Sequence, residues 1–189
     1  KMKFILASKS PRRRDILKKG NFIFKVVPSK FDESKISKRL NPREYCMKLA
    51  RSKAQDILGE YDNYTIIGAD TIVVIDNLIL NKPKNISEAK NMLRLLSNRE
   101  HQVITGVSLQ NSILNIDHTF FDISKVTFYK LSNSEIDRYI LDYNPLDKAG
   151  SYGIQDGSCL FIKAIKGSYD NIVGFPISKF YQVLKEIIK

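Results

Sequence analysis

The sequence lacks tryptophan entirely, contains two cysteines and two histidines, and has no long hydrophobic run. The cysteines, Cys46 and Cys159, form no Cys-x-x-Cys pair, which argues against a disulfide framework or a zinc site and fits a reducing compartment. No apolar stretch approaches the roughly 20 residues that cross a bilayer. The apolar start of the chain turns polar at Ser8, too early for a secretory signal. We therefore expect a cytoplasmic protein that does not associate with membranes.

Several common catalytic motifs are missing as well. There is no G-x-S-x-G sequence, so a serine hydrolase is not expected. Neither a Walker A loop nor a G-x-G-x-x-G sequence is present, so any phosphate site has to be of another kind. His101 and His118 have no metal-ligand spacing and no partner motif, and we interpret both as structural.

What the chain has in excess is positive charge. Its 31 Lys and Arg residues outnumber its 20 Asp and Glu residues, which gives a formal net charge of +11. We interpret the basic residues as spread along the whole chain rather than gathered in a block. Such a charge fits either a nucleic-acid-binding surface or pockets for small phosphorylated ligands.

The length of 189 residues and a hydrophobic content of 43% suit one domain, or one domain with two lobes. β-branched apolar runs alternate with segments that begin at a proline or a capping residue. We expect Ser87 to cap the third helix, and Ser132 with Glu135 to form a capping box for the fourth. The expected strands are 3–7, 22–27, 65–69, 72–75, 101–109, 113–116, 121–129 and 159–165, and the expected helices are 11–19, 42–58, 87–96, 133–142 and 176–188. This alternation predicts a mixed α/β sheet with helices on both faces.

The turn after the first expected strand, residues 7–14, places serines and three consecutive arginines at the start of a helix. Cations at this end of a helix are disfavoured by a few tenths to about 1 kcal/mol each. A bound anion would reverse that balance, because free backbone N–H groups and guanidinium groups would both point at it. The segment is therefore either a phosphate cradle or a solvated surface turn.

Asp70 is the most informative single residue. It lies between two apolar segments, 65–69 and 72–75, which we interpret as separate strands with a break at Asp70. A partly buried carboxylate has to be paired, hydrogen-bonded or metal-bound, and strand ends in α/β sheets commonly bind ligands. A structural turn aspartate is the alternative. With Asp32 and Glu33 in the polar loop 28–40, Asp70 could supply the carboxylates that hold Mg²⁺ beside substrate phosphates.

Two lysines and one loop are also candidates. Lys53 interrupts the apolar column that Leu49 and Ile57 form on a helix, so it either lies at the edge of that face or reaches an anionic ligand. Lys82 precedes Pro83, which stiffens the loop that presents the lysine. The loop 145–155 combines glycines with polar groups, so it either lets backbone approach a ligand or serves as a connector.

In their order along the chain, these segments resemble one family, the Maf-like nucleotide pyrophosphatases. The resemblance covers nearly the whole chain and rests on residues 6–13 (LASKSPRR), 68–71 (GADT), 82–83 (KP), 101–107 (HQVITGV), 145–155 and 167–176 (GSYDNIVGFP). It implies hydrolysis of a nucleoside triphosphate to monophosphate and pyrophosphate, dependent on Mg²⁺ or else Mn²⁺, as house-cleaning of the nucleotide pool. It also implies a single Maf-like domain, 1–189, often in a homodimer. The implied fold is an elongated mixed sheet flanked by helices, with two lobes around a central cleft, of the Maf/ITPase-like kind.

The resemblance further assigns roles to individual positions. It implies that Asp70, Lys53, Lys82 and Arg13 are catalytic, that Asp70 and Glu33 hold the metal, and that Ser8, Arg12, Arg13, Thr71 and Gln155 bind the substrate. The set Arg12, Thr71 and Gln155 is similar to the branch that acts on dTTP, UTP and modified uridine nucleotides. The branch that acts on 7-methyl-GTP instead has a tryptophan at the first of these positions.

Two other classes of function stay open as alternatives. The charge suggests a nucleic-acid-binding module, which would bind with an affinity that falls steeply with salt. The family's name comes from an effect on septum formation, which suggests a regulator of cell division with a protein partner. We expect a small-molecule nucleotide as the ligand and no nucleic acid.

Overall fold

The computed structural model describes residues 2–188, so the first and last residues of the expected domain 1–189 lie outside the described residues. Seven strands form one sheet. They are β1 (Phe4–Leu6), β2 (Phe24–Val26), β3 (Thr65–Ile75), β4 (Leu78–Leu80), β5 (Glu100–Asn111), β6 (Ile116–Phe128) and β7 (Ile162–Lys166). Their order in the sheet is β2-β1-β3-β5-β6-β7, with β4 paired to β3. β1 is parallel to both β2 and β3, whereas β4 is antiparallel to β3 and β7 to β6. The expected mixed α/β sheet is therefore confirmed. No helix of the described residues is long and apolar enough to cross a membrane.

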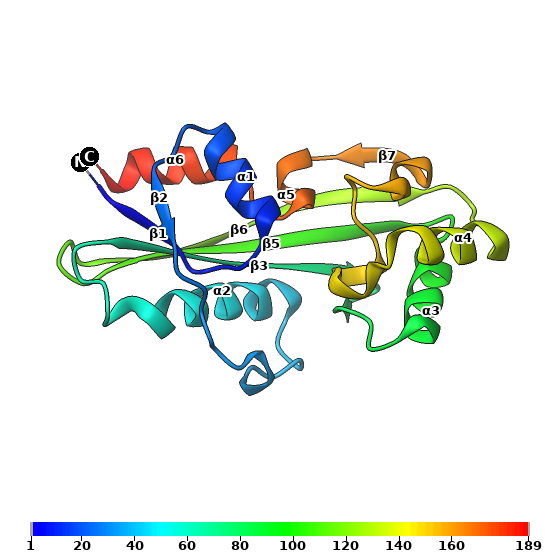
Figure 1. Cartoon of the computed structure of the whole chain (residues 1–189), viewed down its shortest axis with the longest axis horizontal. Coiled ribbons are helices and arrows are strands. Elements are labelled where there is room, and N and C mark those ends of the chain that lie inside the picture. The colour runs from blue at the N-terminus through cyan, green and yellow to red at the C-terminus, as the bar shows by residue number, and fades with distance from the viewer. Residues whose placement is uncertain (1, 189) are drawn as a thin grey trace. The chain divides into compact units, whose positions relative to one another are not determined.

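The helices are α1 (Pro11–Lys19), α2 (Pro42–Leu58), α3 (Ile86–Leu96), α4 (Asn133–Tyr143), α5 (Tyr169–Val173) and α6 (Ile177–Ile187), as labelled in Figure 1. The chain divides into two compact units. Unit 1 comprises the described parts of 1–71, 105–122 and 174–189, and unit 2 comprises 72–104 and 123–173.

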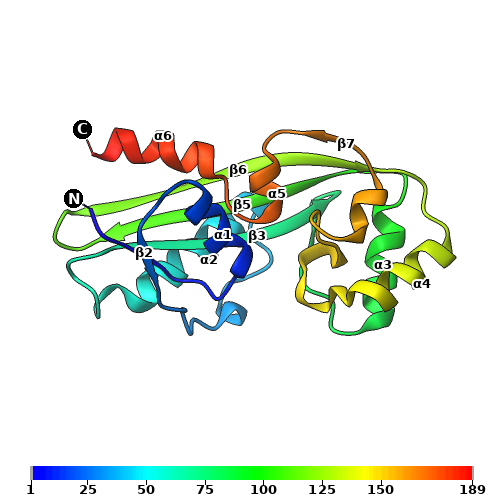
Figure 2. The ribbon, with the colours of Figure 1, turned by 45° about the horizontal axis from the view of Figure 1, so that its top comes forward.

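In unit 1, helices cover both sides of the first strands. Figures 1 and 2 show α2 on one side of β1 and β3 and α6 on the other. Because side chains alternate along a strand, Phe4 of β1 packs edge-on against Phe180 of α6, at 6.4 Å between ring centroids, while Ile5 clusters with Ala54 and Ile57 of α2. β1 therefore joins the two helical layers of this unit and brings its carboxyl end, at Ala7 and Ser8, next to α1.

Unit 2 has an aromatic core. The His101 ring is 5.0 Å from Phe128 and 5.4 Å from Tyr152, and Phe161 packs on Phe128 at 6.0 Å. His101 is 2% exposed, and its Nε2 lies 2.7 Å from the Tyr152 hydroxyl. The structural interpretation of His101 agrees with this setting. The pKa of His101 is lowered to about 4, because burial disfavours the charged ring and Glu100 opposes this only in part.

Several boundaries differ from the expectations. β3 runs without interruption from Thr65 to Ile75, so the expected break at Asp70 is wrong. Residues 113–116 are mostly a turn, with Asn115 at φ 52°, rather than a strand. Asn85, not Ser87, caps α3 by accepting a hydrogen bond from the Glu88 N–H, whereas the expected capping box of Ser132 and Glu135 is present.

Candidate active site

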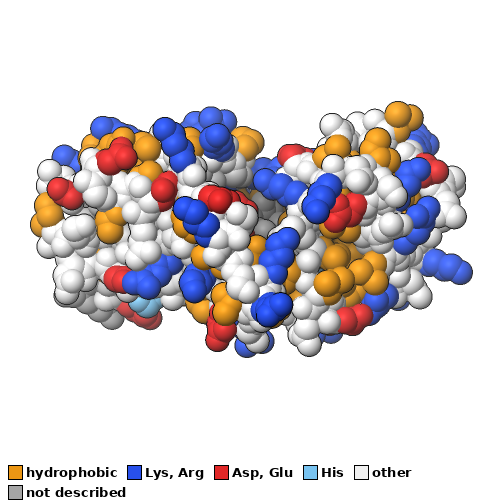
Figure 3. All heavy atoms as spheres, turned by 90° about the horizontal axis from the view of Figure 1, so that it is seen from below, with side chains coloured by type: hydrophobic (Ala, Val, Ile, Leu, Met, Phe, Trp, Pro, Cys, Tyr) orange, Lys and Arg blue, Asp and Glu red, His pale blue; other side chains and the backbone are white. Residues whose placement is uncertain are grey.

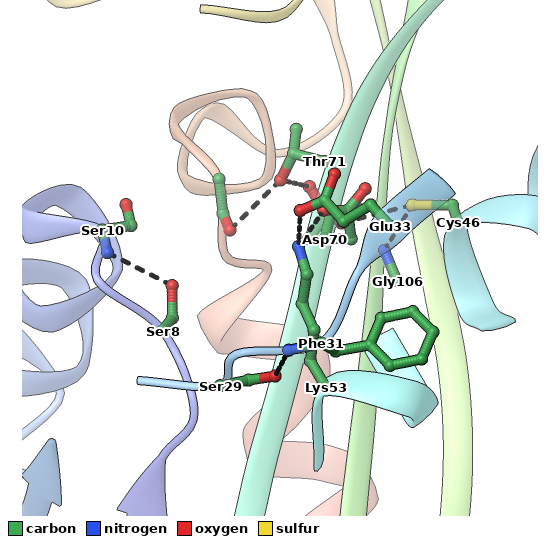
Figure 4. A network of polar contacts seen from close by, with 12 residues as sticks. Ser8, Ser10, Ser29, Phe31, Glu33, Cys46, Lys53, Asp70, Thr71 and Gly106 are labelled. Atoms are coloured by element: carbon green, nitrogen blue, oxygen red, sulfur yellow. Dashed lines mark hydrogen bonds and ion pairs between the residues drawn. The ribbon is translucent and has the colours of Figure 1, made fainter. Parts of the chain in front are cut away.

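The centre of the site is a buried ion pair between β3 and α2. The Lys53 ammonium donates to Oδ1 of Asp70 at 2.6 Å, and it also lies 2.7 Å from Oε1 of Glu33. The side chains of Lys53 and Asp70 are 14% and 12% exposed, whereas Glu33 is 55% exposed. Figure 4 shows the lysine reaching from α2 toward both carboxylates. Lys53 therefore contacts two carboxylates of the protein itself, and its expected contact with an anionic ligand stays a prediction.

Local sequence explains how Lys53 comes to lie against the strand. Asn41 caps α2 by accepting from the Arg43 N–H, and Pro42 opens the helix. The helix then passes very close to β3, because Gly68 has no side chain: a Cβ at Gly68 would lie 2.1 Å from the Ala50 carbonyl oxygen. Lys53 stands on the same helix one turn from Ala50, so its side chain extends along the strand toward Asp70.

The charges within this group affect one another. Burial opposes the charged form of Lys53, but Asp70 and Glu33 outweigh it, so the pKa of Lys53 is raised. Burial lowers the pKa of Arg13, although Asp70 opposes that change. Both side chains are cationic at neutral pH, because both ordinary values lie far above it.

Arg13 of α1 is held by three groups from the rest of unit 1. Its Nε donates to the Gly174 carbonyl oxygen at 2.9 Å, its Nη1 to the Ser8 hydroxyl at 3.1 Å and its Nη2 to the Thr71 hydroxyl at 3.1 Å. The Thr71 hydroxyl lies 3.0 Å from that of Thr105 on β5. We call the acceptors Ser8, Thr71 and Gly174, together with Thr105, the Arg13 socket.

The loop that carries Glu33 is tied to the body of unit 1. Asp56 of α2 accepts from the Ser29 hydroxyl at 2.8 Å and from the Lys30 N–H at 2.7 Å. Asp32 then caps the short 3-10 turn Glu33–Lys35 by accepting from the Ser34 N–H. These contacts bring Glu33 within reach of Lys53.

Cys46 also belongs to this region and was not singled out from the sequence as a site residue. Its thiol donates to the Asp70 carbonyl oxygen at 3.2 Å and accepts from the Gly106 N–H at 3.1 Å (Figure 4). Burial and the nearby Asp70 raise the pKa of Cys46, so the thiol is protonated and can donate. Its spacing of seven residues from Lys53 puts both on one face of α2. That spacing is the one signal in the sequence that could have pointed to it.

The structure brings six of the predicted site residues together in unit 1: Ser8, Arg13, Glu33, Lys53, Asp70 and Thr71. Arg12 is partly buried on α1 beside Arg13. Lys82 and Gln155 belong to unit 2, where both are exposed, Lys82 after β4 and Gln155 in the segment that follows Ile154. The functional roles of all nine stay predictions.

The carboxylates permit a divalent ion but do not make a complete protein cage. Within residues 2–188 no group of three or more His, Cys, Asp or Glu side chains could hold a metal. Asp70 and Glu33 nevertheless converge on one cationic nitrogen. Mg²⁺ is commonly held by one or two carboxylates and completed by substrate phosphates and water, so this pair fits it.

The positive charge is not spread as we expected. Residues 1–53 contain 17 Lys and Arg and 4 Asp and Glu, whereas residues 54–189 contain 14 and 16. The whole excess therefore comes from the segment that contributes α1, the Glu33 loop and Lys53. On the face displayed in Figure 3, Lys and Arg side chains lie among neutral and acidic ones rather than in one continuous block.

Known proteins match this chain over nearly its full length. The family described as Maf-like protein matches residues 3–187. A dTTP/UTP pyrophosphatase of Bacillus pumilus is 47% identical over 181 residues, 96% of this chain and 94% of that protein. One from Bacillus cytotoxicus is 45% identical over 184 residues, 97% and 95%, and one from Carboxydothermus hydrogenoformans is 43% identical over 185 residues, 98% of each. A dITP/XTP pyrophosphatase from Mycobacterium abscessus superposes with a TM-score of 0.51 at 11% identity, covering 100% of this chain and 99% of that one, which shows a shared fold.

Proposed function

The chain belongs to the Maf-like protein family, and we propose that it hydrolyses dTTP and UTP to the nucleoside monophosphate and pyrophosphate. Relatives that carry the name dTTP/UTP pyrophosphatase support this, since they are 41–47% identical over nearly the full chain. One structural observation carries the proposal: a buried carboxylate, Asp70, is held beside the cations Lys53 and Arg13 within one unit. A nucleotide pyrophosphatase has to hold a polyphosphate with cations next to a group that promotes attack on phosphorus.

Each side chain of this group has a function in the proposed reaction. Asp70 accepts the proton of the attacking water or orients it, because its carboxylate is the buried acceptor of the site. When the triphosphate enters, Lys53 exchanges its contact with the half-exposed Glu33 for a phosphate oxygen and keeps its contact with Asp70. Arg13 and Lys53 then stabilise the charge that grows on the departing pyrophosphate. Removing one such cation is expected to cost about 2–4 kcal/mol of transition-state stabilisation.

We also propose a divalent metal, most simply Mg²⁺, held by Asp70 and Glu33. When bound, the ion would neutralise part of the phosphate charge and lower the pKa of a coordinated water. The proposal further includes Lys82 as a third phosphate-binding cation, and Arg12, Thr71 and Gln155 as contributors to nucleotide selection. Gln155 can both donate to and accept from the imide edge of a pyrimidine. We place the reaction in the cytoplasm, where cysteine thiols such as that of Cys46 stay reduced.

Pyrophosphate release from dTTP, UTP, CTP and GTP, with and without Mg²⁺, tests the proposal. Wild-type protein should release pyrophosphate from dTTP and UTP fastest and only with the metal present. Asp70→Asn should nearly abolish release while its circular dichroism stays that of the wild type. Asp62→Asn is the matched control, since it removes one carboxylate from an exposed position of the same unit. Equal rates on all four nucleotides would contradict the pyrimidine preference, and full activity of Asp70→Asn would contradict the assignment of Asp70.

A further inference from the structure

The Arg13 socket contains one residue, Thr105, to which neither the family resemblance nor the proposed function gives a role. Thr105 is fully buried on β5. Its hydroxyl lies 3.0 Å from the Thr71 hydroxyl, which in turn accepts from Nη2 of Arg13. Thr105 is therefore linked to the guanidinium group through a single intervening oxygen.

The Thr71 hydroxyl has three hydrogen-bonding neighbours, which are Arg13, Thr105 and Gly174. A hydroxyl has one proton to donate and two lone pairs to accept with. Its proton can go to the Gly174 carbonyl oxygen at 3.4 Å, which can only accept. It accepts one hydrogen bond from Arg13, and in its 3.0 Å contact with Thr105 either hydroxyl can be the donor. In either direction this contact holds the Thr71 oxygen in place beside Arg13.

The same count shows what Arg13 can still bind. A guanidinium group has five N–H donors. The hydrogen bonds from Arg13 to Gly174, Ser8 and Thr71 use its Nε–H and one N–H on each terminal nitrogen. One N–H remains on Nη1 and one on Nη2, a pair that can grip two oxygens of one phosphate. The Ser8 hydroxyl accepts from Arg13 and from the Ser10 N–H, so its own proton is left for a further acceptor.

We propose that Thr105 is a positioning residue that acts through Thr71 to aim the guanidinium of Arg13 at a substrate phosphate. This inference rests on the proposed function, in which Arg13 binds the triphosphate. Gly174 completes the arrangement, because its φ of 131° turns its carbonyl oxygen toward Arg13 and Thr71 in a conformation that favours glycine. The hydroxyl of Thr71 thus orients a cation of the site, Arg13.

The test compares Thr105→Val, which keeps the shape of the side chain and removes the hydroxyl, with Thr105→Ser, which keeps the hydroxyl. Loss of this hydrogen bond next to a charged group should lower kcat/KM for dTTP about tenfold. Thr105→Ser should stay within about twofold of the wild type. Thr119→Val is the matched control, since it removes a hydroxyl–hydroxyl hydrogen bond, 2.8 Å to Ser108, in the same unit. It should leave kcat/KM unchanged.

A double-mutant cycle separates positioning from a purely structural role. In an Arg13→Lys background, Thr105→Val should cause no further loss, because there is no guanidinium to aim. A loss that adds fully to that of Arg13→Lys would overturn the proposal, and so would wild-type kcat/KM in Thr105→Val. If Thr105→Val fails to fold, Thr71→Val breaks the same chain of hydrogen bonds at the next oxygen and takes its place in the cycle.

A measurement without substrate keeps the inference distinct from the proposed function. In protein labelled with ¹⁵N-arginine, the Nε–H signal of Arg13 is identified by its loss in Arg13→Lys. Its exchange with water should be slow in the wild type and in Thr105→Ser, and at least about tenfold faster in Thr105→Val. If no nucleotide yields pyrophosphate but the exchange rates behave as expected, the proposed function fails and the socket stands. If the exchange rate is the same in all three proteins, the socket is wrong.

Discussion

The ion pair of Lys53 and Asp70 allows a direct test of whether the two buried charges of the site stabilise each other. Each side chain is about an eighth exposed, and their nearest atoms are 2.6 Å apart. Replacing Lys53 with methionine removes the charge and keeps most of the volume. Asp70 is then left as a buried carboxylate without its cation, and breaking a buried pair in this way typically costs about 3–5 kcal/mol. Because both side chains retain some contact with water, we expect about 3 kcal/mol.

The assay is urea unfolding at pH 7, followed by circular dichroism, for a complete double-mutant cycle. Asp70→Asn alone should cost less than Lys53→Met, because Lys53 keeps its contact with Glu33 at 2.7 Å. Adding Asp70→Asn to Lys53→Met should recover stability, since it removes the unpaired charge. We expect a coupling free energy of about 2 kcal/mol between the two positions.

Two control variants show whether the loss of stability is specific to the buried pair. Lys179→Met removes a lysine of the same unit that is 45% exposed and 3.9 Å from Asp122, and it should cost no more than about 1 kcal/mol. Glu33→Gln should also change stability little, because Glu33 is 55% exposed. If Lys53→Met and Asp70→Asn prove additive, or if Lys53→Met is no worse than Lys179→Met, the two charges do not depend on each other and the description of the site is wrong.

Three further predictions concern other parts of the molecule. The pKa of His101 is lowered to about 4 from an ordinary value of 6.5, so between these pH values the unfolded chain binds a proton that the folded chain excludes. The free energy of unfolding should therefore be highest above pH 6.5 and fall by up to about 3 kcal/mol on going to pH 4. Urea titrations between pH 4 and 7 should show this slope in the wild type and a flatter one in His101→Gln; parallel slopes would contradict it. The positive segment 1–53 should attract a triphosphate, so kcat/KM should fall as ionic strength rises. This fall should be less steep in Lys30→Gln/Lys35→Gln than in the control Lys163→Gln/Lys166→Gln from unit 2. Identical slopes in the two double variants would argue against attraction by this segment. Gly68→Ala should destabilise the protein by about 3 kcal/mol or more, because its Cβ would overlap the backbone of α2. Gly59→Ala, whose Cβ would have nothing within 4 Å, should be nearly neutral in the same urea assay. A small effect of Gly68→Ala would contradict the close approach of α2 to β3.

The parts of the fold that could be predicted are those with local signals. The bounds of α1 and α2 agree with expectation because Pro11 and Pro42 mark their first residues and the glycines 20 and 59 follow their ends. The capping box at Ser132 likewise depends on residues three positions apart. α5 was missed, since its five residues are too few to show a helical period.

Asp70 shows where local reasoning fails. A charged residue between two apolar runs suggested a break in the strand, but β3 continues through it. The strand tolerates the carboxylate because Lys53, 17 positions earlier, supplies a cation at 2.6 Å. The pairing of the two residues depends on how α2 docks on the sheet, and no spacing along the chain encodes that docking.

The Arg13 socket was out of reach for the same reason. Its members come from the end of β1, from β3 and β5, and from the segment before α6, so the sequence separates Arg13 from Gly174 by 161 positions. Each of these residues alone resembles an ordinary buried or turn residue. Their common function appears only when the donors of one guanidinium are counted against the acceptors around it.

The small side chains of α2 connect the packing of unit 1 with its chemistry. Cys46, Ala50 and Ala54 recur every four residues on the face toward the sheet, and all three are fully buried. Opposite them, a Cβ at Gly106 would lie 2.7 Å from the Cys46 carbonyl oxygen, so the helix backbone also comes close to β5. A helix carrying leucine at these positions would stand farther from the sheet, at the usual separation set by larger side chains, and the Lys53 ammonium would then fall short of Asp70. The close approach therefore fixes the distance on which the buried pair depends, and the thiol of Cys46, bonded to the Asp70 carbonyl oxygen at 3.2 Å, holds the strand at that same point.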